Sequence, residues 1–167
     1  MSVDFFNVEC QTITKVKRFG LFDAEDQTPA LIKFDDEESW NATVINDNST
    51  ELLFTAIDNC IEILRNNGEM DSRCDVMLTY ENTLLLIELK NKRDSWQQEG
   101  LSQIESTLKR IMIENPAFYN GFKKRKAIVA NAKYQFPSFQ AANLEQREYF
   151  WRSYRARVQF DSEIVIN

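Results

Sequence analysis

The stretch Leu84-Leu85-Leu86-Ile87-Glu88-Leu89-Lys90 decides the fold of this chain. Its apolar run predicts a central strand that is covered on both faces. Because side chains alternate along a strand, Glu88 and Lys90 share one face and Leu89 points to the other. Asp75 adds a third charge to the neighbouring apolar run, residues 74–78. Charges beside a buried strand are costly unless they are paired or used, so Asp75, Glu88 and Lys90 form the candidate site.

The segments around this stretch predict a mixed sheet. The polar pair Glu81-Asn82 separates strands expected at about 73–80 and 83–90, which indicates an antiparallel hairpin. A helix is expected at about 96–114, because its apolar residues recur on one face. A buried strand at 126–130 should then return parallel to the strand at 83–90.

The two ends of the chain supply further elements. Residues 1–47 are β-rich, with strands expected near 12–17, 30–34 and 42–45. Residues 49–66 are expected to be helical, because their apolar side chains follow a helical period. That apolar face comprises Leu53, Ile57, Cys60, Ile61 and Leu64. Residues 141–156 are expected to form another helix, and 163–166 a last strand.

These elements predict an α/β (α+β) fold with a mixed central β-sheet flanked by helices. The 167 residues suggest one domain. Within it, residues 1–47 are a β-rich N-terminal elaboration, 49–131 the core, and 132–167 a C-terminal helix and strand.

The composition excludes several kinds of catalysis. The chain contains no histidine, which excludes Ser-His-Asp and Cys-His catalysis and histidine–zinc sites. Its four glycines are too scattered for a phosphate-binding loop. Carboxylate, lysine and metal chemistry remain as possible means of catalysis.

Charge is distributed unevenly along the chain. Residues 1–83 carry 17 acidic and 6 basic side chains, whereas residues 84–167 carry 9 acidic and 14 basic ones. The basic half can present a face to nucleic acid, and the acidic half can contact a protein partner or keep the molecule soluble. No run approaches the length of a membrane span, so no membrane partner is expected. A homodimer stays open.

The cysteines and the N-terminus predict a cytoplasmic location. The three cysteines, Cys10, Cys60 and Cys74, are odd in number and lack paired spacing, which favours a reducing compartment over a disulfide framework. The first residues lack the basic start and apolar stretch of a secretory signal.

Asp75, followed by Glu88-x-Lys90 at the end of the next strand and then by a helix and a strand, resembles the PD-(D/E)XK nuclease superfamily. The resemblance covers about residues 49–131 and implies a restriction-endonuclease-like core. It implies an enzyme that hydrolyses DNA phosphodiester bonds with Mg²⁺, for which Mn²⁺ can substitute. A catalytically inactive member of the same fold, acting as a protein- or nucleic-acid-binding module, is the alternative.

The resemblance also implies roles for individual residues. Asp75 and Glu88 would hold the metal, helped by the Leu89 backbone carbonyl, and Lys90 would orient the attacking water. Glu51, on the expected first helix, would be an additional catalytic carboxylate. Gln103 fits a glutamine that RecB-type relatives carry on the helix after this strand. Their tyrosine four residues later is Thr107 here.

Each of these assignments has a structural alternative. Asp75, Glu88 and Lys90 could form a salt bridge at the sheet end. Glu51 has capping-box spacing from Asn48, and Gln103 could be a solvated helix position.

Two basic runs and one aromatic segment could contact nucleic acid. The runs supply Lys92, Arg93, Lys123, Lys124 and Arg125 as candidate phosphate contacts. Aromatic and arginine residues also interleave over 147–157, a pattern that suits stacking on single strands, although an aromatic core face is the favoured interpretation.

Overall fold

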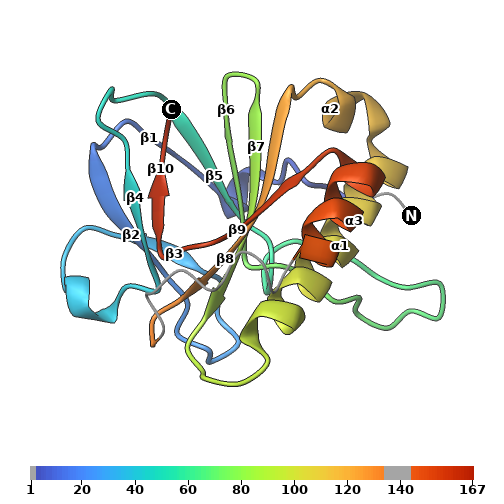
Figure 1. Ribbon diagram of the computed structural model, residues 1–167, viewed down its shortest axis with the longest axis horizontal. Helices are drawn as coiled ribbons and strands as arrows, with labels where there is room; N and C mark the ends of the chain where they lie inside the picture. The colour runs from blue at the N-terminus through green and yellow to red at the C-terminus, as the bar shows by residue number, and fades with distance from the viewer. Residues whose placement is uncertain (1–2, 134–143) are drawn as a thin grey trace.

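The computed structural model describes residues 3–133 and 144–167 and shows two β-sheets and three α-helices in that part of the chain (Figure 1). The six-stranded sheet has the order β1-β5-β6-β7-β8-β9. Its strands are Gln11–Thr14, Leu52–Ala56, Val76–Tyr80, Thr83–Lys90, Lys124–Asn131 and Arg157–Phe160. The four-stranded sheet has the order β10-β4-β2-β3. Its strands are Glu163–Val165, Ala42–Ile45, Arg18–Phe22 and Leu31–Lys33. The predicted mixed α/β fold is therefore confirmed.

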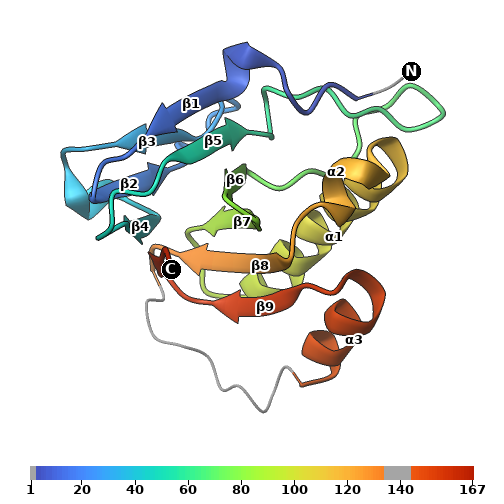
Figure 2. The same cartoon turned by 90° about the horizontal axis from the view of Figure 1, so that it is seen from above.

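The helices cover one face of the six-stranded sheet, and the small sheet covers the other (Figure 2). The helices are α1 (Trp96–Glu114), α2 (Pro116–Asn120) and α3 (Leu144–Tyr154), and two short 3-10 turns, Val8–Cys10 and Glu37–Ser39, complete the elements. Helices therefore flank the central sheet as predicted, on one face, and a second sheet covers the other face.

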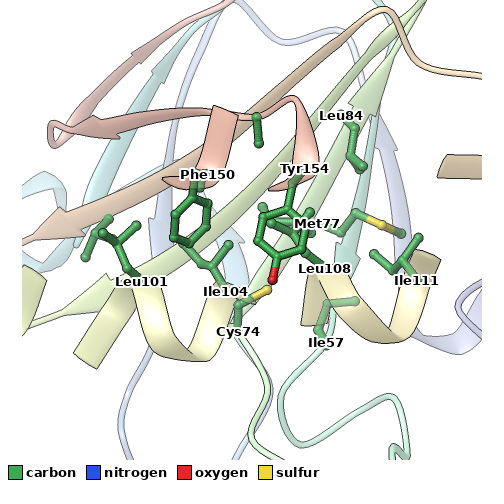
Figure 3. Packing of buried hydrophobic residues seen from close by; sticks show 14 of the residues in the cluster. Ile57, Cys74, Met77, Leu84, Leu101, Ile104, Leu108, Ile111, Phe150 and Tyr154 are labelled. Carbon is green, nitrogen blue, oxygen red and sulfur yellow. The ribbon is translucent and has the colours of Figure 1, made fainter. Parts of the chain in front are cut away.

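The alternation along β7 divides the core into two layers. Leu84 and Leu86 pack with α1 and α3, whereas Leu85, Ile87 and Leu89 pack with the small sheet. Figure 3 shows the helical side, where Leu101, Ile104, Leu108 and Ile111 of α1 and Phe150 and Tyr154 of α3 gather. Glu88 and Lys90 therefore lie on the helical side of the sheet.

The hairpin and the crossover agree with prediction. β6 pairs antiparallel with β7, and β7 pairs parallel with β8 along its whole length, from Thr83 opposite Lys124 to Lys90 opposite Asn131. Helix α1 spans the predicted residues. β8 extends the predicted strand at both ends, and β10 covers residues 163–165. The first three residues of the helix expected at 141–156 lie outside the described residues.

The helix predicted for residues 49–66 is wrong. Residues Leu52–Ala56 form β5, which pairs antiparallel with β1 on one side and with β6 on the other. The apolar spacing that suggested a helix comes partly from β5 and partly from the loop behind it. Two backbone ladders satisfy the polar groups of this segment, and a helix in the same place would leave the facing edges of β1 and β6 without these partners. Strands β2 and β9 were also missed.

The two ends of the chain interlock with the core. β1 joins the six-stranded sheet, and β10 pairs parallel with β4 in the small sheet. The segment 1–47 therefore contributes to both sheets, and the C-terminal strand completes the sheet that the N-terminal segment begins.

A disulfide joins Cys10, before β1, to Cys60, after β5. The expectation of unpaired cysteines is thus wrong for this pair, while Cys74 is free and buried as expected. Sequence spacing gave no sign of the pair, because the two residues are 50 positions apart and meet only through the pairing of β1 with β5. Disulfides are characteristic of oxidising compartments, so the pair removes the argument for a reducing one.

Gly20 in β2 allows Trp40 to lie against the strand. A Cβ atom built at this position would stand 2.1 Å from the Trp40 ring, far inside contact distance. We expect Gly20→Ala to lower the free energy of unfolding by about 2 kcal/mol, because the ring must move out of a packed site. Urea denaturation measures the loss. Gly121→Ala is the control, because its Cβ would meet only ordinary contacts at 3.4 Å, and an equal loss there would contradict the explanation.

Candidate active site

Asp75, Glu88 and Lys90 converge at one end of the β6–β7 hairpin. Asp75 immediately precedes β6. Glu88 and Lys90 are among the last three residues of β7. The Leu89 backbone N–H donates to Asp75 Oδ2 at 2.7 Å, and the Asp75 backbone N–H donates to Glu88 Oε1 at 3.1 Å. Each carboxylate is thus fixed by the backbone of the strand that carries the other.

Lys90 supplies the positive charge of this group. Its Nζ lies 3.2 Å from Glu88 Oε2 and donates to Gln103 Oε1 of α1 at 2.6 Å. Glu99 Oε2 is 3.9 Å away, too far for a hydrogen bond. An ammonium group carries three donors, so one donor of Lys90 remains for a further acceptor.

Both carboxylates are deeply buried. Asp75 is 4% exposed and Glu88 is 2% exposed. Burial raises the pKa of Asp75 well above its ordinary value, and the nearby charge of Glu88 raises it further. Burial also raises the pKa of Glu88, to about 7, although the Lys90 ammonium opposes the rise. Burial therefore works against the charged forms of both groups, and the Lys90 ammonium favours the charged form of Glu88.

Two carboxylates that sequence reasoning missed lie around the pair. Asp58 follows β5, is half-buried, and pairs with Arg73 at 3.0 Å. Burial raises the pKa of Asp58, and its charge in turn raises the pKa of Glu88. Asp23 follows β2, and its charge raises the pKa of Asp75. Asp58 was hidden because its segment was interpreted as a helix, and Asp23 because no signal in the sequence links it to the hairpin.

Gln103, for which the resemblance implies a role, lies beside Lys90 on α1. Besides accepting from Lys90, it donates through Nε2 to the Arg73 carbonyl at 3.4 Å. Gly100, one turn earlier, lets α1 approach β8, because a Cβ there would lie 2.5 Å from a Val129 methyl carbon. This close approach keeps Gln103 within reach of Lys90.

Thr107, one turn after Gln103 on α1, holds the backbone next to Asp75. Its buried hydroxyl accepts from the Cys74 N–H at 2.9 Å and lies 3.3 Å from the Gln103 carbonyl, to which it donates. One side chain of α1 thus connects the residue before Asp75 with the residue that contacts Lys90.

Thr107→Val should lower the free energy of unfolding by about 2 kcal/mol, because it leaves the buried Cys74 N–H without an acceptor. Thermal and urea unfolding measure the change. Thr107→Ser keeps the hydroxyl and should retain most of the stability. A serine variant as unstable as the valine variant would show that packing, and not the hydrogen bond, is responsible.

Glu51 does not belong to this group. It precedes β5 at the end opposite Asp58 and is exposed. The antiparallel pairing of β5 with β6 places Leu53 beside Thr79, and Ala56 beside Val76, next to Asp75. Glu51 therefore lies a strand length away from Asp75, and the capping role expected for it also disappears because no helix begins there.

The two basic runs lie at opposite ends of the sheet. Lys92 and Arg93 directly follow β7 beside the site, and Lys92 pairs with Glu99 at 2.7 Å. Lys123, Lys124 and Arg125 lie at the start of β8, beside the beginning of β7. The structure does not bring the two candidate runs together, because β7 and β8 are parallel and the second run stands at the start of its strand.

The oxygen donors around Asp75 and Glu88 suit some divalent ions better than others. In residues 3–133 and 144–167, no group of three or more His, Cys, Asp or Glu side chains is placed to hold a metal. Mg²⁺ commonly binds through one or two carboxylates and keeps several waters. Asp75 and Glu88, with the Leu89 carbonyl, fit that limited donor set and would not fit an ion that needs a full protein cage.

Known proteins give no further guide to this site. No protein-family model, curated protein or solved structure matches the chain. None of the helices in the described part of the chain has the length and apolar character that crossing a bilayer requires.

Proposed function

We propose that this protein is a Mg²⁺-dependent nuclease that hydrolyses DNA phosphodiester bonds. The observation that supports the proposal is the convergence of Asp75, Glu88 and Lys90, with Gln103 behind the lysine. The arrangement of β5, β6 and β7, followed by α1 and the parallel strand β8, also agrees with the core that the PD-(D/E)XK resemblance implies after its first helix.

Each residue has a chemical task in this proposal. Asp75 and Glu88 would hold the ion, which when bound polarises a phosphoryl oxygen and lowers the pKa of a bound water. Lys90 has one free donor with which to orient the attacking water or contact the phosphate. Gln103 fixes the Lys90 ammonium at 2.6 Å and so acts as a positioning residue.

Both basic and acidic side chains surround the site. Lys92 and Arg93 lie at the exit of β7, where a phosphate backbone entering the site would pass. Asp23 and Asp58 add negative charge that a bound cation must offset. Cleavage should depend strictly on a divalent ion, because the bound ion would polarise the phosphoryl oxygen and lower the pKa of the attacking water.

A second function has its own support. The oxygens of both carboxylates already accept backbone hydrogen bonds, and both groups are almost fully buried. This is the arrangement of a structural ion pair, and it favours a catalytically inactive nuclease-like fold that serves as a protein- or nucleic-acid-binding module. The exposed acidic side chains of residues 1–83 would contact a protein partner.

Location is part of the proposal. A cytoplasmic nuclease would meet DNA directly, and we propose that location on this ground. The Cys10–Cys60 disulfide opposes it, because such bonds are rare in reducing compartments. Counting free thiols in protein isolated under alkylating conditions distinguishes the two: three labelled cysteines support the cytoplasm, and one labelled cysteine contradicts it.

Incubation with supercoiled plasmid tests the enzymatic proposal. We expect nicked or linear DNA with millimolar Mg²⁺ or Mn²⁺ and intact plasmid with EDTA. A melting temperature that rises with Mn²⁺ while the plasmid stays intact would support a metal site without hydrolysis. No cleavage and no metal-dependent rise in melting temperature would contradict the nuclease and support the binding module, in which the carboxylates form a structural ion pair.

A further inference from the structure

A basic cavity lies at the far end of the β7–β8 ladder from Asp75 and Glu88. It has a volume of about 370 Å³ and surrounds Trp151 of α3, near Tyr80 and Thr83. Six of the side chains that line it are basic: Lys123, Lys124, Arg125, Lys126, Arg155 and Arg157. They come from the start of β8, from the turn after α3 and from the first residue of β9, segments that are brought together by the parallel pairing of β8 with β9.

Within residues 3–133 and 144–167, these cations have no carboxylate partners. None of the six forms an ion pair with an acidic group of the described residues, although ion pairs are frequent elsewhere on this surface. The residues that the structure does not describe, 1–2 and 134–143, contain no aspartate or glutamate. In a protein with net charge −6, six unpaired cations around one cavity are a local concentration of charge, and their mutual repulsion is relieved by a bound anion.

Some groups that line the cavity are held by hydrogen bonds, and others have exposed charged side chains. Arg125 donates to the Tyr119 carbonyl at 3.0 and 3.2 Å and stacks over the Tyr119 ring, so it belongs to the frame. The Lys123 and Lys124 backbone N–H groups both donate to the Asn82 carbonyl, which fixes the start of β8. The side chains of Lys123, Lys124, Arg155 and Arg157 remain exposed and can reach a ligand.

Trp151 gives the cavity an aromatic surface. Its side chain is 42% exposed, whereas Phe150 and Tyr154 of the same helix are buried in the core. The guanidinium groups of Arg155 and Arg157 lie 5.5 and 5.0 Å from the centre of its ring. A row of cations beside an exposed aromatic ring is the arrangement with which proteins hold single-stranded nucleic acid without reading its sequence.

We propose that this cavity binds single-stranded nucleic acid, with its cations on successive phosphates and Trp151 stacked on a base. The site is separate from the carboxylate group, since Thr83 and Lys90 are seven residue steps apart along β7, about 23 Å at the rise of a strand. Binding here does not depend on cleavage. A chain that never hydrolyses DNA can still hold a strand in this cavity.

Fluorescence anisotropy with a short labelled oligo(dT) in EDTA at low salt tests the proposal. The triple variant Lys123→Gln, Lys124→Gln, Arg157→Gln should bind on the order of tenfold more weakly than the wild type, and the slope of log K against log salt should fall by about 2. The triple variant Lys15→Gln, Lys17→Gln, Lys109→Gln changes net charge equally at exposed positions elsewhere and should bind like the wild type. Equal losses in the two variants would overturn the proposal.

A second measurement separates a nucleic-acid strand from other phosphates. Trp151→Leu should weaken oligo(dT) binding roughly tenfold without changing the salt slope, because stacking is lost and the phosphate contacts remain. Unchanged affinity would overturn the assignment to a single strand. Sedimentation with vesicles of phosphatidylserine and phosphatidylcholine is the other arm: binding to vesicles but not to oligo(dT) would overturn the proposal in favour of a lipid surface. Because EDTA removes the divalent ion, failure of this binding and failure of DNA cleavage are independent results.

Discussion

Lys90→Met and Asp75→Asn should each reduce Mg²⁺-dependent plasmid cleavage by roughly 10²- to 10⁴-fold. Methionine keeps the apolar stem of Lys90 but removes the ammonium that donates to Gln103 Oε1 at 2.6 Å. Asparagine keeps an acceptor for the Leu89 N–H but removes the charge that a metal ligand needs. The two substitutions therefore test the chemistry of the site with little change in its shape.

The matched control for Lys90 is Lys109→Met. Lys109 lies exposed on α1 and forms no ion pair with the described residues, so its replacement changes net charge equally without reaching the site. The control should cleave at the wild-type rate. Cleavage that survives both Lys90→Met and Asp75→Asn, in protein that melts as the wild type does, would rule out these residues as the catalytic group.

The stability of the metal-free protein should fall as pH rises from about 5 to about 8. The pKa of Glu88 is about 7 in the folded protein and 4.5 ordinarily, so the folded state binds the proton more tightly. For an acid whose pKa is raised by folding, stability is greatest below the ordinary value and is lost as pH rises through the folded value. The shift corresponds to roughly 3 kcal/mol, and the raised pKa of Asp75 acts in the same direction.

Urea denaturation at a series of pH values measures this fall. The chain has no histidine, so the usual contribution of that side chain to the same pH range is absent. Glu88→Gln should flatten the profile, because the titrating group is removed while an acceptor for the Asp75 N–H is kept. A wild-type profile that is flat or rises over this range would mean that Lys90 keeps Glu88 ionised.

Metal should reverse the fall. A divalent cation binds the ionised carboxylates, so it stabilises the folded protein most at high pH, by about 2.7 kcal/mol at a hundred times its dissociation constant. Glu88→Gln should lose this response. The same titration therefore separates a metal site from a structural ion pair, since an ion pair gives the pH dependence without the response to Mg²⁺ or Mn²⁺.

The candidate site was largely predictable because its residues are close in sequence. Asp75 and Glu88 belong to one hairpin whose polar turn, Glu81-Asn82, sets the register that brings them together. Gln103 follows on a helix whose length and apolar face are local properties. Asp58 and Arg73 could not be placed in the same way, because their positions depend on which strand pairs with β6.

The sequence by itself determined the hairpin, the helix Trp96–Glu114, the parallel strand after it, and the shared face of Glu88 and Lys90. Local periodicity and turn residues carry that information. Only the tertiary structure decided that residues 52–56 are a strand, that Cys10 meets Cys60, and that Lys123 to Lys126 face Trp151 at the far end of the sheet. These features depend on pairing between segments far apart in the chain, where hydrogen bonding and packing outweigh the local preference of either segment.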